Sequence, residues 1–136
     1  MTFLVERLAE LRRQLDHLYA VRERIREPRD LESDLSLHND ALFALLVVCQ
    51  SVIDIAGELA GRRGLRFNDY TEAVRALGSV EGISRSTADA LLPLPGFRNV
   101  LIHEYVALDY ARVIAALHNL DAVEQLIAAV SRLETR

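Results

Sequence analysis

Three side chains suited to phosphate chemistry lie close together in residues 96–105. Arg98, His103 and Tyr105 follow the order Arg, four residues, His, one residue, Tyr. Arginine stays charged at any working pH and binds phosphate oxygens through a planar fork of donors, whereas histidine titrates near neutrality and can transfer protons. An imidazole that takes the proton of a ribose 2′-hydroxyl, beside a guanidinium that stabilises charge on the phosphorane, would cleave RNA without a metal ion. The same spacing also arises by chance, as a solvated arginine and a hydrogen-bonded histidine.

The spacing of these residues has a geometric consequence. On a regular helix successive residues turn by about 100°, so Arg98 and His103 point about 140° apart. Arg98 and Tyr105 would share one face, and Asn99 and His103 another. One helix therefore does not aim the arginine and the histidine at one atom. Two copies of the segment meeting across a two-fold axis would place all four charged groups in one cleft.

The rest of the chain must supply the elements that position this segment. Apolar residues recur at helical spacing from Leu4 to Ile25, and no stretch alternates at period two for long enough to form a strand. The sequence therefore predicts an all-α fold. The first predicted helix is ended by Pro28, short turns follow within residues 29–39, and a second helix runs from about 40 to 60. A third helix runs from a cap at Asn68 or Asp69 to Leu77, and a fourth from a cap at Ser84 to Leu92. After a break at Pro93, Pro95 and Gly96, a fifth helix carries the motif, and the last helix runs from about 109 to 133.

Composition limits the class of protein. A chain of 136 residues, with 51% hydrophobic and 26% charged residues, predicts one domain over 1–136. The longest apolar run, residues 41–49, is far shorter than the roughly 20 residues that span a membrane, and no leader is visible, so we expect a cytoplasmic protein. A net charge of −4 argues against a protein that coats nucleic acid, so any RNA binding must be local.

The remaining reactive residue types predict no metal or cofactor. Cys49 is the one cysteine and lies within the apolar run, where a buried thiol is expected. His17, His38 and His118 are isolated and lack the spacing of metal ligands. Arg62, Arg63 and Arg66 make a basic turn with Gly61 and Gly64, either as favourable charge at a helix C-terminus or as part of an RNA path.

The motif, Arg98, four residues, His103, Glu104 and Tyr105, resembles the Arg-x4-His-x-Tyr signature of HepT-type toxins in the HEPN superfamily. Residues 52–55 resemble the family's apolar-Asp-apolar step in the long central helix, and Asp109 falls where the family's next helix starts. The resemblance implies an antiparallel bundle of about five to six helices that forms a homodimer. It implies the toxin of a toxin–antitoxin pair, an endoribonuclease that cleaves tRNA or mRNA at a composite site on the dimer interface.

The resemblance also assigns roles to single residues. Arg98 would bind phosphate and stabilise charge, and His103 would transfer the proton, with Asn99 orienting the histidine or the scissile phosphate. Asp54 would hold Arg98 or His103 in place, although a solvent-facing aspartate is an equal alternative. Tyr105 would receive AMP from an MNT-type nucleotidyltransferase antitoxin that binds the toxin, modifies it, or both. The alternative function is a noncatalytic helical module that partners such a nucleotidyltransferase.

Overall fold

The computed structural model describes residues 2–135, and within this range every regular element is helical, as predicted. The elements follow one another in the order α1 (Thr2–Arg22), α2 (Pro28–Glu32), α3 (Leu35–Arg62), α4 (Tyr70–Arg75), η1 (Ala76–Ser79), α5 (Arg85–Leu91), α6 (Leu94–His103), η2 (Tyr105–Ala107), α7 (Tyr110–Leu117) and α8 (Asp121–Glu134). The helices α1 to α8 exceed the five to six expected, because the predicted last helix is divided into α7 and α8, and the segment predicted to form short turns contains the regular helix α2.

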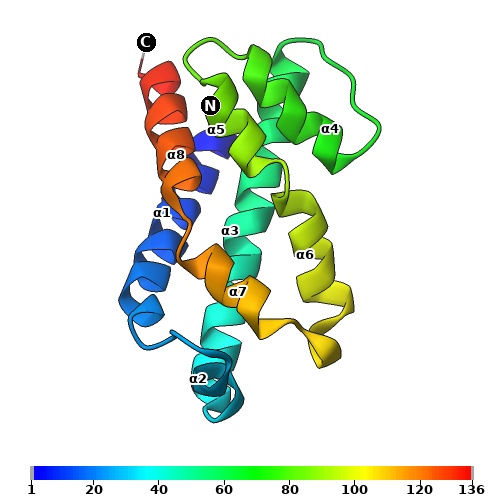
Figure 1. Cartoon of the computed structure of the whole chain (residues 1–136). Coiled ribbons are helices and arrows are strands. Elements are labelled where there is room, and N and C mark those ends of the chain that lie inside the picture. Colours follow the sequence, from blue (N-terminus) through cyan, green and yellow to red (C-terminus); the bar gives the residue numbers. More distant parts are fainter. Residues whose placement is uncertain (1, 136) are drawn as a thin grey trace.

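Helix α3 runs through the middle of the bundle (Figure 1), with α1 antiparallel to it on one side and α6 on the other. Its side chains are apolar around most of the helix, and Leu45, Val52 and Ile55 are fully or almost fully buried. The facing stripe of α1 contributes Leu11 and Leu15 to the same core. An apolar helix of this kind is stable in water only when neighbours cover it, and α1, α6 and α4 supply most of that cover.

By length and composition alone α3 could cross a membrane, with a mean hydropathy of 1.9 over its most apolar window. More than half of that window, 56%, is buried inside the bundle. The core helix of a water-soluble domain meets the same criterion, so the apolar character of α3 is accounted for by packing.

The predicted first helix was wrong at its C-terminal end. It ends at Arg22, and Pro28 begins α2 instead of ending α1. Proline lacks an N–H and is tolerated in the first helical turn, where that donor has no partner in any case. Helix α3 also starts earlier than predicted, at Leu35, because the carboxylate of Asp34 caps it by accepting from the Leu37 N–H at 3.0 Å.

The predicted break before the motif is present at Leu92 and Pro93, between α5 and α6, but it was wrong for Pro95 and Gly96, since α6 begins at Leu94 and carries Pro95 in its first turn. The predicted last helix is divided into α7 and α8, which meet at 43°. The Nε2 atom of His118 is 2.9 Å from the Ile25 carbonyl oxygen at this bend, which ties it to the segment after α1. Asp109 caps α7 as expected, accepting from the Ala111 N–H at 3.1 Å.

Candidate active site

Arg98 is held against the central helix. Buried Phe97 and Leu101 fasten α6 to the core, which sets the half-buried Arg98 beside α3. Its Nε donates to Gln50 Oε1 at 2.9 Å, and its Nη1 donates to Asn99 Oδ1 at 2.9 Å. The guanidinium also lies over the ring of Tyr70, with 5.9 Å between Cζ and the ring centroid. Within residues 2–135, Arg98 has no acidic partner and its Nη2 makes no hydrogen bond, so donors remain for an anion.

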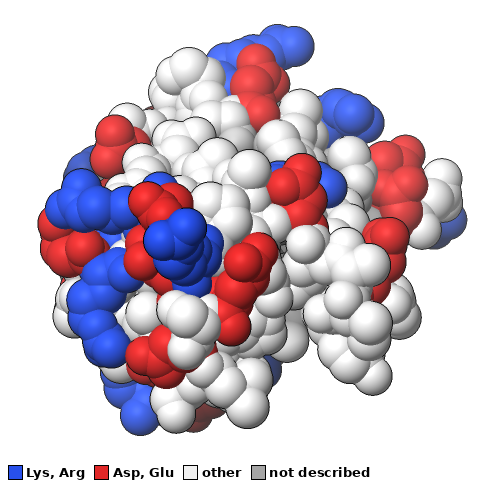
Figure 2. All heavy atoms as spheres, turned by 60° about the horizontal axis from the view of Figure 1, so that its bottom comes forward, with Lys and Arg blue, Asp and Glu red and all other residues white. Residues whose placement is uncertain are grey.

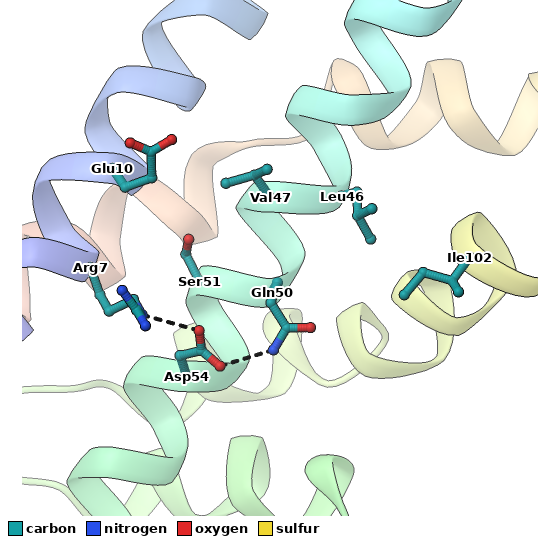
Figure 3. A pocket seen from close by; sticks show the side chains of 8 residues that line it. All are labelled: Arg7, Glu10, Leu46, Val47, Gln50, Ser51, Asp54 and Ile102. Atoms are coloured by element: carbon teal, nitrogen blue, oxygen red, sulfur yellow. Dashed lines mark hydrogen bonds and ion pairs between the residues drawn. The ribbon is translucent and has the colours of Figure 1, made fainter. Parts of the chain in front are cut away.

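Gln50 belongs to a longer sequence of contacts, which we call the polar chain: Arg7, Asp54, Gln50 and Arg98. Gln50 Nε2 donates to Asp54 Oδ1 at 2.9 Å, and Asp54 Oδ2 accepts from Arg7 Nε at 3.2 Å (Figure 3). A guanidinium can only donate and an ionised carboxylate can only accept. The Gln50 amide therefore has one orientation that satisfies both neighbours, with its oxygen toward Arg98. The polar chain connects α1, α3 and α6 and fixes the direction of Arg98.

A cavity of about 300 Å³ lies along the polar chain. Figure 3 shows Arg7, Gln50 and Asp54 on its wall together with apolar side chains of α3 and with Ile102 of α6. Its remaining lining residues are Glu10, Leu46, Val47 and Ser51. The cavity is open to solvent and has both a charged and an apolar wall. Such a cavity suits a segment of a polar polymer or the surface of a second protein.

His103 is the last residue of α6 and is exposed. Among the described residues it has no hydrogen-bond or ion-pair partner, so its imidazole is accessible to a substrate. Asn99 lies one turn earlier on the same exposed side of α6, as the spacing predicted. The Asn99 side chain accepts a hydrogen bond from Arg98, however, so Asn99 orients the arginine in this structure.

Tyr105 does not share a helical face with Arg98, and this part of the sequence prediction was wrong. Helix α6 ends at His103, the Glu104 N–H closes the last turn on the Val100 carbonyl, and Tyr105 lies in η2. Its side chain is 65% exposed beside His38 and Phe43 of α3, in a hollow of about 220 Å³. Tyr105 is therefore open to a modifying enzyme.

Asp54 had been expected to hold Arg98 or His103 in place. In the structure it contacts neither of them directly. Gln50, one turn earlier on α3, lies between Asp54 and the arginine, and Arg7 supplies the charge that a half-buried carboxylate requires. Sequence reasoning missed Gln50, Arg7 and Tyr70. Gln50 had a signal, because Gln50 and Asp54 are polar residues one turn apart in an apolar helix, whereas Arg7 and Tyr70 had none.

In the described part of the chain, no three His, Cys, Asp or Glu side chains are grouped in a way that could hold a metal ion.

Comparison with solved structures defines the fold. The Shewanella oneidensis HEPN toxin, tri-AMPylated and in complex with an MNT antitoxin, matches with a TM-score of 0.82 and 21% identity, over 97% of this chain and 98% of that one. A MntA–HpeT toxin–antitoxin mutant matches with a TM-score of 0.81 and 20% identity, over 96% and 98%. A toxin–antitoxin complex with AMP-PNP gives 0.79 and 19%, over 96% and 98%. No curated protein sequence matches.

These similarities define an all-α domain with the fold of HEPN toxins. The family model "Ribonuclease HepT-like" matches residues 6–131, and the chain therefore belongs to the HepT-like ribonuclease family.

Proposed function

We propose that this protein is the toxin of a HepT/MNT-type toxin–antitoxin system, a metal-independent endoribonuclease that acts in the cytoplasm. In this proposal Arg98 binds the scissile phosphate and His103 transfers the proton. The observation that carries the proposal is the fixed Arg98: the polar chain orients its guanidinium, its Nη2 is free among the described residues, and an accessible imidazole ends the same helix.

The chemistry follows from these groups. Attack of a ribose 2′-hydroxyl on the adjacent phosphorus needs a base to accept the hydroxyl proton and a donor to protonate the leaving 5′ oxygen. Imidazoles are suited to both roles near neutral pH. Negative charge grows on the phosphoryl oxygens in the transition state, and the free donors of Arg98 would bind it. Two histidines are needed if base and acid are separate groups, which favours a site shared by two protomers.

The surface along α3 supports a homodimer. Phe43 is 62% exposed and Leu35 71%, and Val106 in η2 is 88% exposed. In Figure 2 acidic and basic side chains mingle on one side of this end of the molecule, whereas the opposite side shows uncharged surface interrupted by a few, mostly acidic, side chains. Exposed apolar side chains next to a weakly charged surface are typical of protein interfaces. A two-fold dimer through this face would bring two copies of Arg98 and His103 together.

The partner is proposed to be an MNT-type nucleotidyltransferase that neutralises the toxin by binding, by attaching AMP to Tyr105, or by both. Tyr105 is exposed, and the similar Shewanella oneidensis toxin is described as tri-AMPylated in complex with its MNT antitoxin. AMP groups near His103 would add negative charge and bulk, and would repel the phosphate backbone of an RNA.

Induced expression without the partner tests the proposal. We expect wild-type protein to arrest growth with discrete RNA fragments on a gel, and purified protein to cleave the same RNA in EDTA. Arg98→Ala and His103→Ala should abolish both effects while the fold is kept. Arg112→Ala and His17→Ala are matched controls, because Arg112 also lies over an aromatic ring, that of Phe97, and His17 is an exposed histidine.

The opposite pattern would identify a different function. If soluble wild-type protein neither arrests growth nor cleaves RNA, and the Arg98 and His103 variants bind the nucleotidyltransferase as wild type does, the chain is a noncatalytic helical module.

A further inference from the structure

Residues 63–70 run from the end of α3 to the first residue of α4, and only Tyr70 among them has a contact in the site described so far. We call this segment the 63–70 loop. All of its residues are exposed, and it extends beside the upper part of α3 in Figure 1, at the α4 side of the bundle. Its last residue, Tyr70, is the aromatic side chain under the Arg98 guanidinium. The loop therefore ends in contact with Arg98, the proposed phosphate-binding residue.

The shape of the 63–70 loop is fixed by local contacts. Gly64 has a φ of +70°, a left-handed conformation that favours glycine, and lets the chain leave α3. Phe67 then packs on α3 at Gly57, where a Cβ would be 3.5 Å from the Phe67 ring atom Cζ. Asp69 caps α4 by accepting from the Glu72 N–H at 2.8 Å. The loop is thus a positioned surface, and its Phe67 contacts α3 at Gly57, about one turn beyond Asp54.

The charges of this surface favour an anion. Arg63, Arg66 and Arg75 form no ion pair with any residue in 2–135, although most ion-paired arginines in the chain have an acidic partner within a few residues. The nearby acids are used in capping: Asp69 as above, and Glu72 by accepting from the Asn68 N–H at 2.6 Å. Residues 63–75 therefore carry a local excess of positive charge, three arginines against two acidic residues, in a chain whose net charge is −4.

The aromatic side chains of the loop define what kind of anion it suits. Tyr70 is 47% exposed and Phe67 is 37% exposed, although rings of this size usually lie mostly inside a protein. Exposed aromatic rings beside arginines are the combination that binds single-stranded nucleic acid, because every unpaired base has a face that can stack on a ring. Bases inside a duplex are already stacked on one another and cannot reach such a ring.

We propose that the 63–70 loop binds unpaired RNA next to the cleavage site. In this proposal Tyr70 stacks on the base adjacent to the phosphate held by Arg98, and the strand continues along Phe67 toward Arg66 and Arg63. Tyr70 is then a specificity-determining residue that selects single-stranded over double-stranded RNA. The inference rests on the proposed function, because it takes Arg98 as the phosphate-binding group.

Binding can be measured separately from cleavage in the His103→Ala background. The probes are a fluorescein-labelled 12-nucleotide RNA without secondary structure and the same strand annealed to its complement, followed by fluorescence anisotropy. Tyr70→Leu should weaken binding of the single strand about 5- to 150-fold, the range measured for loss of one base–aromatic stack, and change duplex binding little. Tyr70→Phe should bind as tightly as its parent, since the ring face is kept. Arg66→Gln should reduce the slope of log Kd against log salt by about 0.7.

Tyr110→Leu is the matched control, because Tyr110 is a partly exposed tyrosine whose ring contacts His38 and not Arg98. Thermal melts establish that each variant is folded. The inference is overturned if Tyr70→Leu binds the single strand like its parent, if Tyr70→Phe loses as much affinity as Tyr70→Leu, or if Tyr70→Leu loses the nucleotidyltransferase partner and keeps RNA, which would make the loop a protein interface.

Cleavage by the protein with His103 intact distinguishes the two proposals. If that protein does not cleave RNA while single-strand binding depends on Tyr70, the binding surface stands and the ribonuclease proposal fails. If it cleaves RNA and binding does not depend on Tyr70, the ribonuclease stands and the inference about the loop fails.

Discussion

Gln50→Leu is the most direct test of how the polar chain supports the proposed catalysis. Leucine has a similar volume and suits an apolar helix, so α3 should fold unchanged. The substitution removes the acceptor of the Arg98 Nε–H and the donor to Asp54 in one step. Arg98 keeps its contacts with Asn99 and Tyr70, so it stays near the site but loses its fixed direction.

The size of the effect follows from the lost hydrogen bond. A hydrogen bond with one charged partner contributes about 1.5–3 kcal/mol, and Arg98 is only half-buried, so the lower half of that range applies. If the orientation of Arg98 matters mainly in the transition state, each 1.36 kcal/mol corresponds to a tenfold change in rate. We therefore expect kcat to fall about 10- to 40-fold. KM should change less, because the charge of Arg98 remains.

Single-turnover cleavage of a labelled RNA, with enzyme in excess, isolates the chemical step for this comparison. Gln14→Leu is the matched control, since Gln14 also donates to a carboxylate one turn away, Glu10, at 2.9 Å and has no contact with Arg98. Asp54→Asn should give a smaller decrease than Gln50→Leu, because the carboxylate that fixes the Gln50 amide is gone but the amide itself remains. A Gln50→Leu rate within twofold of wild type, with Arg98→Ala inactive, would refute the role of the polar chain.

Three further predictions concern the scaffold. Hydrogen bonds from Arg12 lower the pKa of Glu124 below its ordinary value of 4.5. The ionised carboxylate therefore stabilises the fold above pH 4.5, and this stabilisation is lost as the pH falls through the lowered pKa. In urea melts, wild type should lose more stability than Glu124→Gln between about pH 5 and pH 3, and equal losses would contradict this. Burial raises the pKa of the Cys49 thiol to about 12, so iodoacetamide at pH 8 should alkylate it only as fast as the protein unfolds, and rapid alkylation of native protein would place the thiol at the surface. Gly57→Ala should stabilise the protein by about 0.5–1 kcal/mol in thermal melts, because alanine is the better helix former and its Cβ would lie at an ordinary contact distance of 3.5 Å from Phe67 Cζ. A lower melting temperature would mean that the added methyl group is not accommodated beside the Phe67 ring.

The helical fold was predictable because its signals are local. The apolar stripe of the first helix and the apolar second helix follow the 3.6-residue period, and Asp69, Ser84 and Asp109 cap helices as their positions suggested. The errors occurred where local rules allow two outcomes. Pro28 and Pro95 can end a helix or begin one, and only packing decided that each lies in a first turn.

The candidate site likewise has features that the sequence predicts and features that depend on tertiary structure. The residue types and spacing of Arg98, His103 and Tyr105 are properties of the sequence, and they suffice to suggest phosphate chemistry and the family. Whether Arg98 is held, and by what, depends on side chains 48 and 28 positions away, Gln50 and Tyr70. No local pattern encodes such contacts, because they exist only when α3, α4 and α6 pack around one core.

The sequence by itself thus determined the helices and the reactive groups, because helix periodicity, capping and the chemistry of arginine and histidine are all written in neighbouring residues. The tertiary structure alone decided how these groups are directed. It placed Gln50 between Asp54 and Arg98, ended α6 before Tyr105, and brought Tyr70 under the guanidinium. Directions of this kind follow from how helices pack, and packing depends on the whole core at once.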